Sequence, residues 1–135
     1  MTYSDLKVIE EEVQFKLTCD SEGNQLEGGV MYKIHLPANI PAREFWSVIV
    51  YDNQTRLVIC TEQLWPSVYS SCKDLVINMD GSVDVWFGPG ATADKKKNWI
   101  QTVPGKGWYM ILRLYGPSES WFNKTWRPGE IEPLK

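Results

Sequence analysis

The sequence predicts an all-β protein, an antiparallel, jelly-roll-like β-sandwich of about eight strands in one domain. Short runs of alternating apolar and polar residues recur along the chain, and clusters of turn-forming residues separate them. No segment sustains the period of an amphipathic helix. A chain of 135 residues can bury such a core without disulfides or metals. We expect residues 13–135 to form the sandwich and residues 1–12 to be an N-terminal extension, part of which is able to form a short helix.

Strands are expected wherever the alternation is regular. In the run 31–36, for example, successive side chains point to opposite sides, which turns Tyr32, Ile34 and Leu36 inward and His35 outward. The expected strands, in chain order, span residues 13–19, 31–36, 45–52, 56–60, 75–79, 83–87 and 108–115.

The strongest local signal is the pair Asp80-Gly81, because Asp-Gly is a preferred two-residue hairpin turn. It predicts a hairpin between residues 75–79 and 83–87. Only residues 4–12 and 119–122 have a composition compatible with a helical turn.

Two of the expected strands, 45–52 and 108–115, are apolar on both faces, whereas a sandwich strand usually has one polar face. The residues that share one face are Phe45, Ser47, Ile49 and Tyr51 in the first run, and Tyr109, Ile111, Arg113 and Tyr115 in the second. A loop, another subunit or a ligand must cover the outer side. We expect self-association through this outer aromatic face, because a monomer seldom leaves a large apolar patch in water.

The composition argues against several partners and locations. The net charge of -3 provides no broad basic field, which speaks against nucleic acid and against an anionic membrane. The basic run Lys95 to Lys97 is read as a solvated loop. No run has the length of a membrane span, and residues 1–12 contain no signal-peptide core. The chain as given is therefore interpreted as cytoplasmic, and the sequence leaves the compartment of the protein open.

The cysteines do not indicate a metal site or a disulfide framework. Cys19, Cys60 and Cys72 show no Cys-x-x-Cys spacing, and a single histidine accompanies them. We expect three reduced, mostly buried cysteines, and neither a metal nor another cofactor.

The candidates for catalysis are weak. His35 is expected on an outward face, and no serine stands in a nucleophile elbow, so no hydrolytic triad is predicted. Asp52, Asp80 and Asp84 are the carboxylates available for acid–base chemistry, but turn formation or solvation also explains them. We assign no catalytic residue.

Arg113 is the most informative charged residue, because it lies in the middle of an apolar strand and a buried guanidinium needs an anionic or carbonyl partner. The structural interpretation ties Arg113 to Asp52, to Asp84 or to a loop carbonyl. The functional interpretation turns it toward a ligand.

Asn98 and Trp99 also have two interpretations. They can pin the long preceding loop onto the sheet through a hydrogen bond and a buried ring. Alternatively, aromatic side chains offer flat faces for a sugar or another ring, with polar groups for specificity. The candidate ligand-binding residues are Trp86, Asn98, Trp99, Tyr109, Arg113 and Tyr115.

An ordered set of short motifs runs through nearly the whole chain. It consists of Asp20-Ser21-Glu22-Gly23, Leu26-Glu27-Gly28, Tyr32, Pro41-Ala42 with Phe45-Trp46-Ser47, Tyr51-Asp52, Asp80-Gly81-Ser82, Asn98-Trp99, Arg113-Leu114-Tyr115-Gly116-Pro117, Trp126 and Pro128. This set resembles the family of domains of unknown function DUF1214. The resemblance implies a jelly-roll-like β-sandwich that often follows a DUF1254 domain in longer, exported-looking proteins. The segment between Thr61 and Cys72 departs from the family pattern, which carries an Asn and an Arg-Tyr pair there.

The family implies no reaction, so the function rests on the residues. We expect a non-catalytic module that binds a carbohydrate, a small molecule or a protein partner. One alternative is an enzyme, or an accessory domain of one, that acts on a glycan or small molecule through an Arg/carboxylate pair. Another is a purely structural remnant of a two-domain ancestor.

Overall fold

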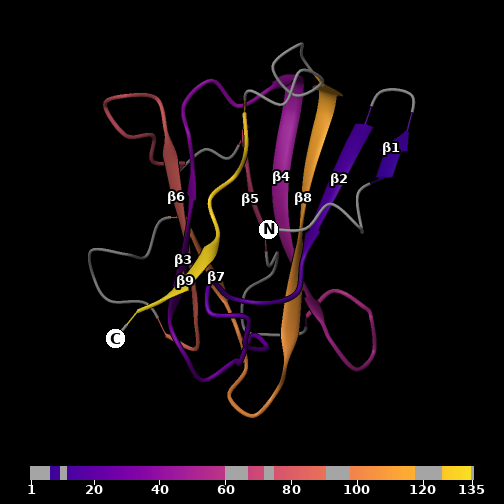
Figure 1. Cartoon of the computed structure of the whole chain (residues 1–135), viewed down its shortest axis with the longest axis vertical. Helices are drawn as coiled ribbons and strands as arrows, with labels where there is room; N and C mark the ends of the chain where they lie inside the picture. The colour runs from indigo at the N-terminus through magenta and orange to yellow at the C-terminus, as the bar shows by residue number, and fades with distance from the viewer. Residues whose placement is uncertain are drawn as a thin grey trace.

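The computed structural model describes residues 7–9, 12–59, 67–71, 75–90, 98–117 and 126–134, and this part contains nine strands and no helix. The strands are β1 (Lys7–Ile9), β2 (Glu12–Leu17), β3 (Tyr32–Leu36), β4 (Ala42–Asp52), β5 (Ser67–Tyr69), β6 (Val83–Gly88), β7 (Trp99–Gln101), β8 (Trp108–Pro117) and β9 (Ile131–Pro133). They form a five-stranded sheet of order β1-β2-β8-β4-β5 and a four-stranded sheet of order β7-β6-β3-β9 (Figure 1). The all-β prediction is confirmed.

Strand β8 is the centre of the five-stranded sheet, where it pairs antiparallel with β2 on one side and β4 on the other. The register sets Ser47 opposite Arg113 and Tyr51 opposite Tyr109. The two doubly apolar runs of the sequence are therefore neighbouring strands. The face that contains Ser47 and Tyr51 lies on the same side of the sheet as the face that contains Arg113 and Tyr109. A register irregularity between Ala42 and Phe45 interrupts the β4–β8 pairing near the start of β4.

The four-stranded sheet departs from the expected antiparallel pattern in one place. Strands β3, β6 and β9 pair antiparallel, but β6 and β7 run parallel, with Trp86 opposite Trp99. The chain between Gly88 and Trp99 is long enough to return to the beginning of β6, which a tight turn does not allow. The strictly antiparallel prediction is wrong at this pair.

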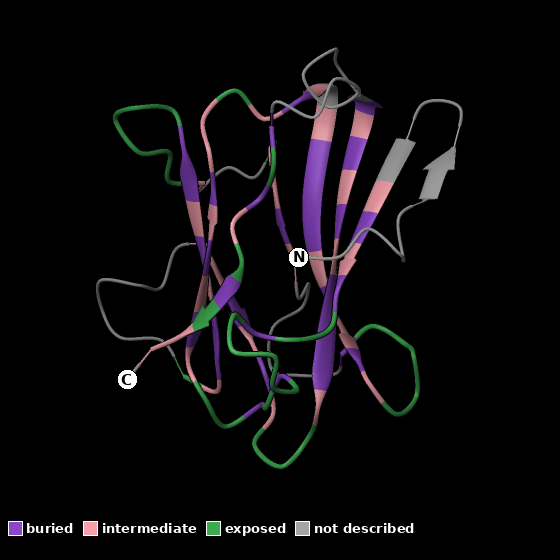
Figure 2. Cartoon of the chain, viewed as in Figure 1, coloured by how far each residue is buried: buried purple, intermediate pink, exposed green. Residues whose placement is uncertain are grey.

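The core lies between the two sheets, and Figure 2 shows buried residues recurring along the strands of both layers. The indole of Trp108 on β8 bridges the layers, because its ring lies 5.6 Å from Tyr32 of β3 and 4.8 Å from Phe87 of β6. The inward alternation predicted for Tyr32, Ile34 and Leu36 is confirmed, since each of them is at most 2% exposed. Burial of large apolar side chains of this kind stabilises a core by about 1.5–3 kcal/mol each.

The hairpin predicted around Asp80-Gly81 is wrong in its first arm. A turn is present, since the Asn78 N–H donates to the Ser82 carbonyl at 2.8 Å. However, residues 75–79 form no strand, and Ile77 and Met79 are exposed. The physical reason is that both edges of β6 are already occupied, one by β3 and the other by β7.

Two further expectations near the ends of strands need correction. Residues 7–9 form the strand β1 instead of part of a helix, which agrees with the β-branched pair Val8 and Ile9. The expected return strand 56–60 is reduced in the described residues to one bridge between Tyr51 and Val58. Strand β5 pairs with β4 from Ser47 to Ile49.

Cys19 is a free thiol, as expected, but it is exposed and not buried. It follows the end of β2 and forms a bridge with Gln25 across a turn, which places it outside the sandwich. Several other expectations lie outside the described residues: Cys60, Cys72, the lysine loop 95–97, the turn 119–122 and most of the segment 61–72.

Candidate functional site

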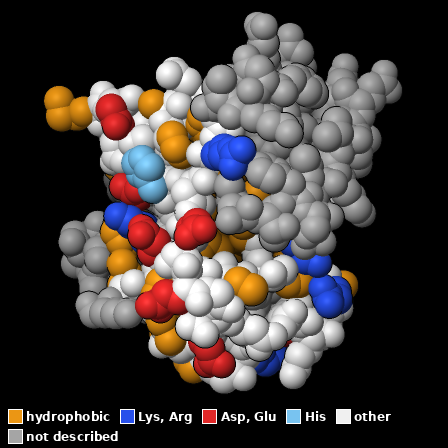
Figure 3. All heavy atoms as spheres, in the orientation of Figure 1, with side chains coloured by type: hydrophobic (Ala, Val, Ile, Leu, Met, Phe, Trp, Pro, Cys, Tyr) orange, Lys and Arg blue, Asp and Glu red, His pale blue; other side chains and the backbone are white. Residues whose placement is uncertain are grey.

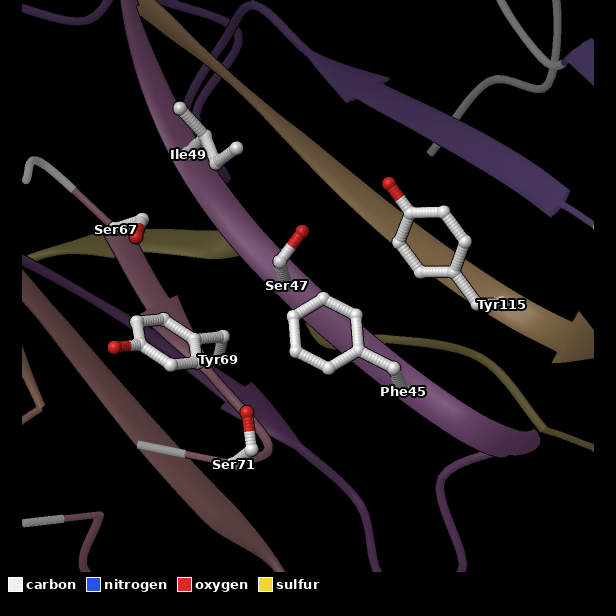
Figure 4. Close-up of a pocket in the computed structure, with 7 residues that line it drawn as sticks. All are labelled: Phe45, Ser47, Ile49, Ser67, Tyr69, Ser71 and Tyr115. Carbon is white, nitrogen blue, oxygen red and sulfur yellow. The ribbon is translucent and has the colours of Figure 1, made fainter. Parts of the chain in front are cut away.

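The outer face of the five-stranded sheet is hollowed by a cavity of about 400 Å³, which we call the outer pocket. Strands β4, β5 and β8 supply its walls, and Figure 4 shows the side chains gathered around it. Its lining residues are Phe45, Ser47, Ile49, Ser67, Tyr69, Ser71 and Tyr115. The volume lies within the range of small-molecule sites in proteins.

Aromatic rings dominate the walls of the outer pocket. The ring of Phe45 lies 5.3 Å from that of Tyr115 on β8 and 6.0 Å from that of Tyr69 on β5. Strand pairing causes this grouping, because Phe45 is opposite Tyr115 and Ser47 is opposite Tyr69. The hydroxyl groups of Ser47, Ser67, Ser71 and the two tyrosines add polar groups to this largely apolar lining.

Farther along the same face, cations gather around two stacked tyrosines, and we call Lys16, Tyr51, Arg56, Tyr109 and Arg113 the tyrosine–cation cluster. The rings of Tyr51 and Tyr109 stack at 5.3 Å with an angle of 10° between their planes. Lys16 Nζ lies 4.8 Å, and Arg56 Cζ 5.6 Å, from the centre of the Tyr109 ring. Tyr109 is therefore only 6% exposed although it faces outward.

Arg113 joins this cluster by donating from Nη2 to Tyr51 Oη at 3.0 Å, and this bond is not its only interaction. The pairing expected with Asp52 or Asp84 is wrong. Asp52 accepts from the turn that follows it and lies 3.6 Å from Lys106 Nζ, whereas Asp84 pairs with His35. Asp52 belongs to the inward-facing set of β4, so alternation turns it away from Arg113.

Asp52 is a turn-capping carboxylate, as the turn interpretation predicts. Its Oδ1 accepts hydrogen bonds from the backbone N–H groups of Gln54 at 2.8 Å and Thr55 at 3.3 Å. These two bonds lower the pKa of the Asp52 carboxyl, and Lys106 adds a smaller effect in the same direction.

Asn98, the residue before β7, makes three side-chain hydrogen bonds at the edge of the four-stranded sheet. Its Nδ2 donates to the carbonyls of Val76 at 2.7 Å and Asp84 at 3.0 Å, and its Oδ1 accepts from the Val76 N–H at 3.0 Å. Asn98 also has a left-handed backbone, with φ of 57°, which asparagine tolerates better than most residues. Asn98 therefore ties Val76 and Asp84 together at the start of β7, while most of the loop that it was expected to pin, residues 91–97, lies outside the described residues.

The neighbouring tryptophans are also held by this sheet. Trp99 donates from Nε1 to the Gly88 carbonyl at the end of β6, at 3.2 Å. Trp86 lies directly opposite Trp99 in the parallel pair, and Lys33 Nζ lies 5.5 Å from the centre of its ring. Both indoles are half-buried.

The four-stranded sheet also carries the chain's histidine. His35 Nδ1 lies 2.7 Å from Asp84 Oδ1, and Asn78 Nδ2 donates to the other carboxylate oxygen at 3.2 Å. A carboxylate oxygen accepts hydrogen bonds, so this geometry suits donation from His35 Nδ1. Figure 3 shows this histidine at the surface beside acidic side chains. Asp80 accepts from the Ser82 hydroxyl and N–H, which lowers the pKa of its carboxyl.

The six ligand-binding candidates do not form one site. Trp86 lies on β6 and Trp99 on β7 of the four-stranded sheet, and Asn98 directly precedes β7. Tyr109, Arg113 and Tyr115 lie on β8 in the other sheet. Of the six, Tyr115 lines the outer pocket, and Tyr109 and Arg113 belong to the tyrosine–cation cluster.

Sequence reasoning missed Tyr69, Lys16 and Arg56 as parts of this face. Tyr69 is hard to find because β5 is only three residues long and directly follows Trp65-Pro66, where the proline interrupts a strand pattern. The alternation of Ser67, Val68 and Tyr69 is the signal that could have indicated the strand. No local sequence pattern predicts the positions of Lys16 and Arg56. Lys16 comes close to Tyr109 because β2 pairs with β8, and Arg56 because it lies in the turn after β4.

Among the residues that the structure describes, no group of three or more His, Cys, Asp or Glu side chains is arranged to hold a metal ion. The same part of the chain contains no helix that is long and apolar enough to span a membrane.

Two open, mostly antiparallel sheets around an apolar core define an all-β domain of the two-layer type. The family model described as "Protein of unknown function (DUF1214)" matches residues 11–119, and the chain belongs to this family. The family resemblance predicted from the sequence is thereby confirmed. No curated protein matches the chain.

Two solved structures are similar to this fold. The VPA0106 protein from Vibrio parahaemolyticus superposes with a TM-score of 0.79 and 26% identity, over 93% of this chain and 31% of that one. A putative uncharacterized protein from Burkholderia cenocepacia gives a TM-score of 0.55 and 16% identity, over 91% of this chain and 29% of that one. The present chain therefore spans less than a third of the length of either protein.

Proposed function

We propose that this domain is a non-catalytic binding module and that its ligand site is the outer pocket. The observation that carries the proposal is the cavity of about 400 Å³ between Phe45, Tyr69 and Tyr115. Aromatic walls supply apolar contact area at a small cost in conformational entropy, and a few hydroxyl groups give orientation. A small organic molecule with a ring suits this combination better than a charged polymer does.

The non-catalytic part of the proposal is supported by how the candidate carboxylates are used. Asp52 caps a turn, Asp80 accepts from Ser82, and Asp84 pairs with His35. The alternative enzyme needs a carboxylate beside Arg113, and Asp52 and Asp84 are both engaged elsewhere. We therefore favour binding over acid–base chemistry.

The proposal extends to the architecture of the longer relatives. The present chain matches about a third of each solved protein, which agrees with a domain that accompanies another. We propose that the domain occurs after a DUF1254 domain in such proteins and that its two sheets derive from a jelly-roll topology. Binding by the outer pocket does not depend on either point.

The test of the binding function uses a neutral aromatic probe, 4-phenylbutanamide, followed by two-dimensional amide NMR of the whole chain. We expect millimolar binding that shifts the signals of Ser47, Ile49 and Tyr69. Ser67→Trp should abolish these shifts, because the new ring fills the pocket, whereas Glu132→Trp on the exposed part of β9 should leave them unchanged. Shifts that survive Ser67→Trp would contradict the proposal.

A second candidate is self-association through the same face. It is favoured by the partial exposure of Phe45, Ile49, Ile111 and Tyr115, which leaves apolar surface on the outer side of the sheet. Sedimentation at micromolar concentration should then show a dimer. A monomer at about 100 μM would exclude any association tighter than that concentration.

A further inference from the structure

We propose that the preferred ligand of the outer pocket is an amphiphilic organic anion, whose apolar body occupies the pocket and whose carboxylate reaches the tyrosine–cation cluster. This inference rests on the proposed binding function and adds the charge and shape of the ligand. It follows from the position of the two features on one face of the sheet.

The pocket and the cluster are contiguous along β4 and β8. Ser47 and Ile49 line the pocket, and Tyr51 is the next residue of β4 on the same face. The opposing residues of β8 are Arg113, Ile111 and Tyr109. At about 3.3 Å per residue, the distance from Ser47 to Tyr51 is about 13 Å. A ring with a three- or four-carbon chain and a terminal carboxylate covers most of this distance.

The charge of the cluster favours an anion. Lys16 and Arg56 interact with the Tyr109 ring and form no ion pair with another residue that the structure describes, and the Arg113 guanidinium donates to Tyr51 on the same face. A cation over an aromatic face keeps its N–H groups available to an acceptor. Lys16 and Arg56 thus place two positive charges on this face in a chain whose net charge is -3.

The tyrosine stack also positions these cations in advance. Lysine and arginine normally lose side-chain entropy when they order around a ligand. Here the Tyr109 ring holds the Lys16 and Arg56 side chains, and Tyr51 holds Arg113. Part of the ordering cost is therefore met before a ligand arrives, which increases the affinity that a single carboxylate can obtain.

The experiment compares 4-phenylbutyrate with its neutral amide, by calorimetry and by amide NMR. We expect the acid to bind about fivefold more tightly than the amide at about 20 mM NaCl, and this advantage to shrink at about 500 mM NaCl, because salt screens exposed charges. The double variant Lys16→Gln/Arg56→Gln should reduce the advantage to less than about twofold, while the affinity for the amide stays unchanged.

The matched control is Lys33→Gln. Lys33 also lies over an aromatic ring, that of Trp86, but on the outer face of the other sheet, so its removal should leave the preference for the acid unchanged. Equal affinities for acid and amide in the unmodified protein would overturn the inference and leave the binding function intact. Failure of both probes to shift the pocket signals would overturn the binding function as well.

Discussion

The outer faces of the two sheets are built from similar residue types but use them differently. On the four-stranded sheet, Asn98 bridges two segments, Trp99 donates to a backbone carbonyl, and His35 pairs with Asp84. On the five-stranded sheet, aromatic rings surround a cavity of about 400 Å³, and cations lie over a tyrosine.

This difference separates a structural use of polar and aromatic groups from a binding use. On the four-stranded sheet, the donors of Asn98 and Trp99 are directed at backbone carbonyls of their own sheet and loops, which leaves them committed to the fold. On the five-stranded sheet, serine and tyrosine side chains line a cavity, and Lys16 Nζ lies over the Tyr109 ring. Substitutions should therefore alter mainly stability on the first face and mainly binding on the second.

The largest stability effect is expected from Asn98→Ala. This variant loses three side-chain hydrogen bonds and places alanine at a φ of 57°, so the free energy of unfolding should fall by about 2–3 kcal/mol. Urea denaturation measures the change. The matched control is Asn39→Ala, because Asn39 has the same backbone conformation, with φ of 63°, but is exposed. A loss as large in Asn39→Ala would show that backbone strain, and not pinning, accounts for the effect.

A smaller effect is expected at Arg113. Because Arg113 donates to the neutral Tyr51 hydroxyl and its loss leaves neither Asp52 nor Asp84 unpaired, Arg113→Met should lower the free energy of unfolding by about 1 kcal/mol. Tyr51→Phe should cost a similar amount, and the double variant should cost clearly less than the sum. A loss near the 3–5 kcal/mol typical of a broken buried ion pair would indicate a carboxylate partner for Arg113 after all.

The pH dependence of stability compares a carboxylate next to each sheet, Asp52 at the end of β4 and Asp80 in the turn before β6. The pKa values of Asp52 and Asp80 are both lowered in the folded protein. A carboxyl with a lowered folded pKa contributes stability above its unfolded pKa of about 4, and that contribution disappears as the pH falls through the folded pKa. Stability should thus fall below about pH 4, and Asp52→Asn or Asp80→Asn should each flatten the decline. An unchanged decline in both variants would contradict this account.

The smallest effects are expected from the two lysines that lie over rings. Lys16→Gln and Lys33→Gln should each change the free energy of unfolding by about 0.5 kcal/mol, the scale of an exposed cation–π contact. The two variants should be alike in thermal melts and differ only in their effect on acid binding. A large destabilisation in one variant would show that its lysine has a structural role.

Periodicity was sufficient to predict the layers of the fold. Period-two alternation placed Tyr32, Ile34 and Leu36 in the core and separated the two faces of β4 and β8 correctly. Strand partners were harder to predict, because they depend on which sheet edge is still available. Residues 75–79 have an acceptable strand pattern, yet β3 and β7 occupy both edges of β6.

The site was only partly predictable for the same reason. Tyr115 was identified because it lies on a doubly apolar strand, and it does line the outer pocket. Trp86 and Trp99 have the same composition signal but belong to the other sheet, and no local pattern distinguishes the sheets. Tyr69 and Lys16 reach the site through long-range pairing alone.

The central place of β8 has a consequence for synthesis of the chain. Strands β2 and β4 are not neighbours, and only β8 links them within the five-stranded sheet. On the ribosome, β2 and β4 are both synthesised well before residues 108–117 emerge. Until then, the edges of β2 and β4 that pair with β8 in the native sheet remain unpaired. Such distant pairing is slow, and unpaired edges invite association between nascent chains. The growing polypeptide is thus most vulnerable to aggregation just before its last long strand is made.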